Sequence, residues 1–296
     1  MDAVLTLIAG PGAALDAARA GTVREALVAL GLDAAAPEWL APGQACDLLF
    51  RGSPDQADAA ARRALAGAAV DVVAQMLDGR RRRLLIADME STIIRQEMLD
   101  ELGELAGLRA RISGITWRAM NGEIDFKESF RERMALLAGL PESALDQAAA
   151  GIELMPGARE LVATMRAAGA WCMLVSGGFR RFTRLVAERC GFDAETGNEP
   201  EIADGRLTGG LLAPVLDADS KAEALVKTVV ARRIPIRSAL AVGDGANDLP
   251  MLEIAGLGVA FHARPGVVAA ARARLDHADL TGLLYAQGYR QSEIVG

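Results

Sequence analysis

Residues 84–92 read LLIADMEST, a short apolar run that ends at Asp88 and continues into polar residues. An apolar run of this length is typical of a parallel strand that is buried on both faces. Asp88 would stand at the carboxyl end of that strand, which is the edge of an open α/β sheet at which ligands bind. We therefore expect residues 84–88 to form a core strand whose terminal acid faces a cleft.

Two other segments repeat this design. Residues 171–178 read WCMLVSGG and residues 238–245 read SALAVGDG, so that Ser176 and Asp244 follow apolar runs in the same way. The carboxyl ends of parallel strands lie at one edge of a sheet, and these polar tips should converge there on one site. A carboxylate, a Ser-Gly-Gly turn and a second carboxylate are suited to bind a phosphate group and a metal ion.

The rest of the chain alternates between helical and strand patterns, with a further apolar strand expected at residues 257–260. This alternation predicts an α/β fold with a doubly wound, mostly parallel, Rossmann-like sheet. A helical region with several glycines, at about 96–152, follows the Asp88 strand, and we interpret it as a cap of short helices that excludes water from the site. Asp204-Gly205 lies between apolar runs and predicts a hairpin within residues 192–218.

Residues 1–79 have the pattern of a small α+β domain that ends at the turn signal Asp78-Gly79, and residues 80–296 form the second domain. Strand and helix alternate so closely in the first domain that we expect two layers, with the helices on one face of the sheet. No cluster of polar residues follows its strands, which favours a structural or dimerising role over a regulatory one. The expected elements are strands at 3–9, 46–51 and 70–76 and helices at about 22–31 and 56–68.

Composition and charge limit the classes of partner. The 296 residues carry a net charge of −7, which argues against general binding of nucleic acid or of an anionic membrane. Four consecutive arginines, residues 80–83, resemble a nucleic-acid patch, but we interpret them as a solvated linker into the first core strand. No apolar run reaches the roughly 18 residues that a membrane span needs. The oligomeric state stays open, and a homodimer is one alternative.

The cysteines and the amino-terminal residues bear on location. Cys46, Cys172 and Cys190 are widely spaced and odd in number, and they form neither a disulfide framework nor a zinc pattern. The first residues lack the basic start of a signal peptide. We expect a cytoplasmic protein.

Four motifs occur in a fixed order in the second domain: DMEST at 88–92, SGGF at 176–179, Lys221, and GDGAND at 243–248. Together they resemble the motifs of the haloacid dehalogenase-like phosphatase superfamily, and most closely those of its phosphoserine phosphatase branch. The segment EMLDEL at 97–102 and the cap segments at 120–122 and 126–133 strengthen the resemblance. The first domain is similar to the extra, ACT-like domain that many bacterial members carry.

The resemblance implies a magnesium-dependent phosphomonoesterase that hydrolyses O-phospho-L-serine to L-serine and phosphate, the last step of serine biosynthesis, through an aspartyl-phosphate. It assigns the chemistry to Asp88 as nucleophile, Glu90 as general acid and base, and Lys221 as the cation that neutralises developing charge. It assigns the Mg²⁺ ligands to Asp88, the backbone carbonyl of Glu90 and Asp244, with support from Asp248. It assigns the phosphate to Ser176, Gly177 and Asn247.

The substrate's head group would be read from the cap. The resemblance assigns Glu97 to the ammonium and Arg133 to the carboxylate, which suits the planar guanidinium because it can bond both oxygens. The alternative is that Glu97 and Arg133 are surface charges on helices. Met120 and Phe126 would close the pocket, although such residues on a helix usually belong to a core.

Glu90 departs from the family pattern, which has aspartate two residues after the nucleophile. The added methylene moves the carboxyl by roughly 1–1.5 Å, the projection of one bond. A shift of that size can lower a rate about 10²-fold. We expect Glu90 to act as acid and base; the alternative is that it supplies mainly its backbone carbonyl. Two rival functions stay open: a phosphatase or phosphotransferase acting on another small phosphomonoester, and a regulatory homologue of low activity.

Overall fold

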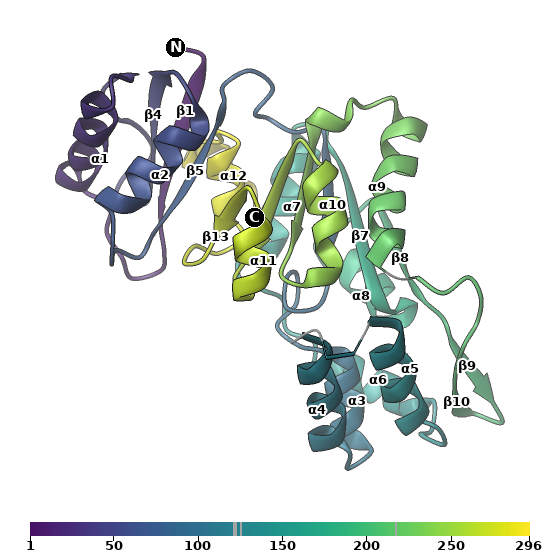
Figure 1. Ribbon diagram of the computed structural model, residues 1–296. Helices are drawn as coiled ribbons and strands as arrows, with labels where there is room; N and C mark the ends of the chain where they lie inside the picture. Colours follow the sequence, from purple (N-terminus) through teal and green to yellow (C-terminus); the bar gives the residue numbers. More distant parts are fainter. Residues whose placement is uncertain (121–122, 125, 217) are drawn as a thin grey trace.

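The computed structural model describes residues 1–120, 123–124, 126–216 and 218–296, without the side chains of Met120, Phe126, Lys127 and Ala218. The predicted roles of Met120 and Phe126 therefore lie outside the described residues. Figure 1 shows an amino-terminal sheet with helices on its outer side, a central sheet flanked by helices, and a further group of helices beyond one end of the central strands.

The central sheet has six strands in the order β13-β12-β11-β6-β7-β8. All of its pairings are parallel. The strand predicted at residues 84–88 is β6, which lies inside the sheet with every residue buried. The strands are β6 (Leu84–Asp88), β7 (Trp171–Phe179), β8 (Ala194–Asn198), β11 (Ala239–Gly243), β12 (Leu257–Phe261) and β13 (Ala273–Leu275).

Helices cover both faces of this sheet because its strands are apolar on both sides. In β6, Leu84 and Ile86 pack in the cluster that contains α9, α10 and α11, whereas Leu85 and Ala87 pack in the cluster that contains α7, α8 and α12. The doubly wound parallel α/β fold is thus confirmed. Among the described residues, no helix has both the length and the apolar character that crossing a membrane requires. The helices are α7 (Ala158–Ala167), α8 (Arg180–Cys190), α9 (Ala218–Arg232), α10 (Leu249–Ile254), α11 (Pro265–Ala270) and α12 (Gly282–Ala286), with short 3₁₀ turns η1 (Ile236–Ser238), η2 (Ala246–Asp248) and η3 (Gln291–Glu293).

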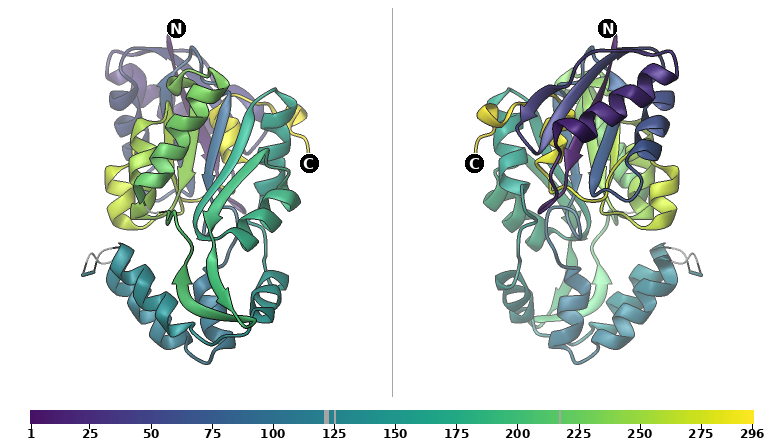
Figure 2. Two further views of the ribbon diagram at one scale, coloured as in Figure 1. Left: turned by 90° about the vertical axis from the view of Figure 1, so that its right-hand side faces the viewer. Right: turned by 90° about the vertical axis from the view of Figure 1, so that its left-hand side faces the viewer.

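The helical insert after β6 consists of several short helices, as predicted. They are α3 (Met98–Leu105), α4 (Arg109–Met120), α5 (Phe126–Leu136) and α6 (Ser143–Ala150). The predicted hairpin is β9 (Pro200–Ala203) with β10 (Arg206–Leu211), and it extends from the core to lie along the insert (Figure 2). Backbone hydrogen bonds join the two, because Gly139 donates to Leu207 and Leu207 donates to Leu140. The hairpin therefore braces the insert against the core.

The amino-terminal sheet is antiparallel, with the order β2-β4-β1-β5 and β3 added beside β4. Its α+β character is confirmed. The short strands β2 and β3 were not predicted, and both helices begin and end earlier in the chain than expected. The elements are β1 (Ala3–Ala9), α1 (Ala17–Ala29), β2 (Asp33–Ala34), β3 (Glu38–Ala41), β4 (Ala45–Arg51), α2 (Pro54–Ala64) and β5 (Val70–Met76).

The second face of this sheet packs against the carboxyl-terminal part of the core. Asp71 of β5 is 1% exposed, and its carboxylate accepts backbone N–H bonds from Asp276, His277 and Ala278 at 2.7–3.1 Å. Gln75 donates to the carbonyl of Ala286 at 2.7 Å. The sheet thus lies beside β13 and α12, away from the helical insert (Figure 1).

The interpretation of residues 80–83 as a solvated linker holds for Arg81 and Arg83, which are exposed, but is wrong for Arg80 and Arg82. Arg80 donates to the buried carboxylate of Asp47 at 2.5 Å. Arg82 donates to Gln75 at 2.6 Å, and Arg81 donates to Glu293 at 2.8 Å. These three contacts give Arg80, Arg81 and Arg82 partners in the amino-terminal sheet and in the carboxyl-terminal segment.

Candidate active site

Asp88 ends β6 with its side chain buried and paired to a cation. Nζ of Lys221, in α9, lies 2.6 Å from Oδ1 of Asp88 and 2.6 Å from Oδ1 of Asp248. Lys221 is 4% exposed and Asp248 is fully buried. Because buried charges are tolerated only when they are paired, Lys221 both fixes Asp88 and offsets the charge of the two acids.

Asp244 and Asp248 come from the segment after β11 and complete an acidic cluster. Oxygens of Asp88, Asp244 and Asp248 all lie within 4.8 Å of one another. The N–H of Gly245 donates to Oδ2 of Asp248 at 3.0 Å, and Thr92 donates to Asp244 at 3.4 Å. Carboxylate oxygens are hard ligands, so this donor set fits a divalent cation such as Mg²⁺.

The Ser-Gly-Gly segment belongs to β7, which continues to Phe179, beyond its predicted end. Gly177 lines the cavity described below, whereas Ser176 lies behind it at 2% exposure. The Ser176 hydroxyl accepts the N–H of Gly178 at 2.8 Å and lies 3.5 Å from Oε2 of Glu90. A Cβ on Gly178 would stand 3.0 Å from that carboxylate oxygen, so glycine at this position lets the backbone approach Glu90 closely.

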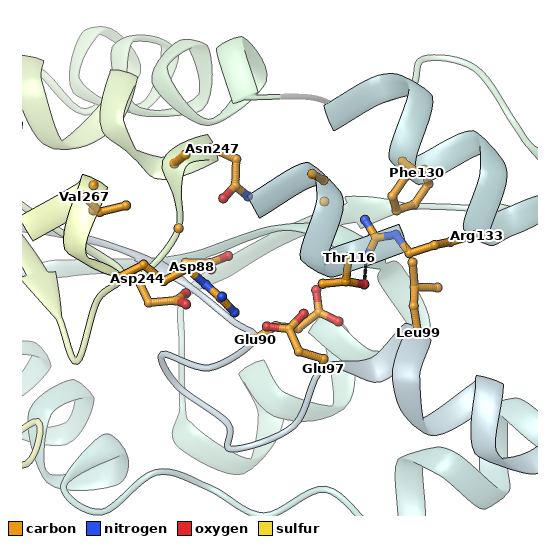
Figure 3. A pocket seen from close by; sticks show the side chains of 16 residues that line it. Asp88, Glu90, Glu97, Leu99, Thr116, Phe130, Arg133, Asp244, Asn247 and Val267 are labelled. Atoms are coloured by element: carbon orange, nitrogen blue, oxygen red, sulfur yellow. Dashed lines mark hydrogen bonds between the residues drawn. The ribbon is translucent and has the colours of Figure 1, made fainter. Parts of the chain in front are cut away.

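A cavity of about 350 Å³ opens between the strand tips and the helical insert. Asp88, Asp244 and Asn247 line it from the core, and Glu97 and Arg133 line it from the insert. In Figure 3 Glu97 lies between the two aspartates and Arg133. The alternative that Glu97 and Arg133 are surface charges is therefore wrong.

Arg133 is held on α5 by neighbours of the insert. It is 8% exposed, and its guanidinium donates to Oγ1 of Thr116 at 3.3 Å and to the carbonyl of Ser129 at 3.4 Å. Burial lowers the pKa of Arg133, and the nearby Glu90 and Glu97 oppose this effect. The guanidinium is thus partly desolvated before any ligand binds.

Glu97 is oriented by the segment that follows Asp88. Ser91 donates to Oε1 of Glu97 at 2.7 Å. Ser91 has φ +55°, a left-handed conformation that is rare for a residue other than glycine and is typical of functional turns. Burial raises the pKa of Glu97, and the Ser91 hydroxyl and Arg133 oppose this effect.

Comparison with known proteins identifies the family. The model of the haloacid dehalogenase-like hydrolases matches residues 85–253, which carry the tips of β6, β7 and β11. The chain belongs to this family. Phosphoserine phosphatase SerB2 of Mycobacterium tuberculosis is 43% identical over 215 residues, which are 73% of this chain and 53% of that protein. The hydrolase thus spans about half the length of this curated relative.

Solved structures of other proteins are also similar to this hydrolase. The unliganded crystal structure of a probable phosphoserine phosphatase from Vibrio cholerae has a TM-score of 0.76 at 31% identity, covering 99% of this hydrolase and 88% of that chain. A structure described as a phospho-aspartyl intermediate analogue of phosphoserine phosphatase has a TM-score of 0.66 at 34% identity, covering 69% of this hydrolase and 98% of that chain.

Glu90 of the hydrolase reaches the cavity with its longer side chain. Oε1 accepts the N–H of Met98 at 2.8 Å, at the start of α3, so that the carboxyl is anchored at the base of the insert. Burial, followed by the negative charge of Glu97, raises the pKa of Glu90 to about 8. The raised pKa favours the protonated carboxyl, which is able to donate a proton.

Sequence reasoning missed several residues of the site. Ser91 and Thr92 lie inside the DMEST motif, but their partners Glu97 and Asp244 follow only from the fold. Arg264 lines the cavity after β12, a strand that was predicted although its tip was not considered. The rule applied to the other strand tips would have pointed to it.

Proposed function

We propose that this hydrolase is a magnesium-dependent phosphoserine phosphatase, which converts O-phospho-L-serine and water to L-serine and phosphate in the last step of serine biosynthesis. One observation carries the proposal: a single cavity joins the acidic strand tips to Glu97 and Arg133. That acid and that base match the ammonium and the carboxylate of a serine head group. The likeness to phosphoserine phosphatases supports this choice.

Asp88, the backbone carbonyl of Glu90 and Asp244 would hold Mg²⁺, and Asp248 would support them. When bound, the ion supplies positive charge between the carboxylate and the phosphate. The surroundings of Asp88 favour a bound cation, because burial, followed by the charge of Asp248, raises the pKa of Asp88 to about 7. Additional positive charge would keep Asp88 ionised at neutral pH.

In the first step a carboxylate oxygen of Asp88 attacks phosphorus, and the bond from phosphorus to the serine oxygen breaks. The departing oxygen takes the proton of Glu90 and leaves as the serine hydroxyl. Lys221, in contact with Asp88, offsets the charge that develops there, and backbone groups at Gly177 hold the phosphate.

In the second step Glu90, now ionised, accepts a proton from water as the water oxygen attacks phosphorus. The bond from phosphorus to Asp88 breaks, which frees the carboxylate and releases phosphate. Glu90 ends protonated, as it began, so that the site is ready for another substrate.

Replacing Glu90 by glutamine should lower kcat by about 10²–10⁴-fold, because the amide neither donates nor accepts the transferred proton in this way. Replacing it by aspartate should lower kcat about tenfold, since this site anchors a longer carboxyl through Met98. Steady-state kinetics of the three proteins measure both effects. Equal turnover by the glutamine variant and the wild type would refute the acid–base role.

Replacing Arg133 by alanine should raise KM for O-phosphoserine by about 10–100-fold, because a charge-assisted contact to the carboxylate is lost. KM for p-nitrophenyl phosphate, which has no carboxylate, should change less than about threefold. Arg131→Ala removes an exposed arginine from the same helix and serves as the control. Equal losses on both substrates would contradict the carboxylate role.

The proposed reaction is tested by phosphate release from a panel of small phosphomonoesters. O-phospho-L-serine should give the highest kcat/KM, EDTA should abolish turnover, and added Mg²⁺ should restore it. Preference for another phosphomonoester, or transfer of phosphate to an added alcohol, would favour the first rival function. The second rival function is a regulatory homologue, and glutamate at position 90, where the family has aspartate, favours it. This rival predicts no magnesium-dependent turnover on any member of the panel.

The proposal includes the organisation of the whole chain. We place the domain boundary between residues 79 and 80 and the cap at about 96–152, with a structural, dimerising or regulatory role for the first domain. We also place the enzyme in the cytoplasm. Size-exclusion chromatography with light scattering would decide whether it is a homodimer.

A further inference from the structure

The carboxyl end of a fourth parallel strand also reaches the cavity. β12 ends at Phe261, and the chain turns at His262, which has φ +45°. The turn is held in place, because the N–H of His262 donates to the carbonyl of Leu275 and Nε2 donates to the carbonyl of Ala278, both at 2.8 Å. Arg264 follows as the residue before α11, and it lines the same cavity as Asp244 and Asn247.

Arg264 differs from the other cations of the site in having no partner within the described residues. Lys221 is bound between Asp88 and Asp248, and Arg133 donates to groups on the insert. For Arg264, which is exposed, the described part of the chain offers neither a hydrogen bond nor an ion pair. Its donors are therefore free to bind a ligand that enters the cavity.

The positive charge of Arg264 is important because negative side chains outnumber positive ones around the cavity. Four carboxylates line it, those of Asp88, Glu90, Glu97 and Asp244, against two arginines. The positive charge of Arg264 acts on Glu97, whose pKa it helps to lower against the effect of burial. The guanidinium is thus within electrostatic range of the acid that would bind the substrate ammonium.

We propose that Arg264 is a specificity-determining residue that binds the substrate carboxylate from the core wall of the cavity, opposite Arg133 on the insert. This inference rests on the proposed function, because it assumes a substrate with a carboxylate beside its ammonium. Two guanidinium groups from separate elements would then bind the carboxylate of the head group from two sides. One of them precedes α11 of the core and the other lies on α5 of the insert.

The test compares Arg264→Ala with the wild type on O-phosphoserine and on O-phosphoethanolamine, which keeps the phosphate and the ammonium but lacks the carboxylate. KM for O-phosphoserine should rise about tenfold, and that for O-phosphoethanolamine should change less than about twofold. Arg264→Lys keeps the charge without the planar fork and should give a rise of roughly threefold. Arg272→Ala, the loss of an exposed arginine outside the cavity, should change neither value.

Binding without turnover gives a second readout. In an Asp88→Asn background, calorimetry with O-phosphoserine should show the same tenfold weakening on adding Arg264→Ala, whereas binding of inorganic phosphate should not weaken. Equal changes for ligands with and without the carboxylate, or no change for either, would overturn the inference. If the wild type favours a substrate that has no carboxylate, the proposed function fails instead, and that result is visible before any variant is made.

Discussion

Replacing Asp88 by asparagine is expected to lower kcat for phosphate release by about 10⁴-fold or more, the scale seen when a catalytic nucleophile is removed. The amide is a poor nucleophile, and Asp248 cannot take the place of Asp88, because Asp248 is fully buried against Lys221. Steady-state phosphate release with O-phosphoserine and Mg²⁺ measures the effect.

The structure of the variant should be preserved, because asparagine has almost the same shape as aspartate and its side-chain oxygen can still accept a hydrogen bond from Lys221. Asp55→Asn, which removes an exposed acid from α2, should leave kcat unchanged. A direct check uses beryllium fluoride with Mg²⁺, which should form an adduct with the wild type and none with the variant. Turnover within about tenfold of the wild type would show that the nucleophile is another group.

The central strands could be predicted from sequence because burial on both faces leaves a continuous apolar run. Leu84–Asp88 is such a run, and the structure gives the predicted bounds. The two-residue strand β2 has no such signal, because its pairing with β4 depends on the surrounding sheet. Arg80 shows a second limit: its partner Asp47 lies 33 residues earlier, and only the packing of the two sheets brings them together.

Some residues of the candidate site could likewise be predicted from local sequence pattern, and others could not. The polar strand tips could be placed from local pattern, but Glu97 and Arg133 followed from a family resemblance, since a charged residue on a helix usually lies at the surface. Arg264 was missed because it comes three residues after β12, beyond a turn at His262 whose left-handed backbone no sequence pattern announces. Contacts such as Ser91 with Glu97 depend on that kind of local geometry.

Replacing Lys221 by methionine is expected to lower the free energy of unfolding of the metal-free protein by about 3–5 kcal/mol, because it leaves two buried carboxylates without their cation. Nζ now lies 2.6 Å from both Asp88 and Asp248, and methionine keeps the bulk of the side chain while removing the charge. kcat should also fall by about 10²–10³-fold, since the charge beside the reacting group is lost.

Urea unfolding without metal measures the stability, and Lys227→Met on the same helix is the matched control. Lys227 is exposed and pairs with the exposed Glu223 one turn away, so its loss should cost less than about 0.5 kcal/mol. Lys221→Arg, which restores a positive charge, should recover part of the stability even if the methionine variant does not fold. If the methionine variant is as stable as the control, the two aspartates do not depend on Lys221, and the charge balance inferred for the nucleophile is wrong. Added Mg²⁺ should stabilise Lys221→Met more than the wild type, because the ion would then replace the positive charge that was lost beside Asp88 and Asp248.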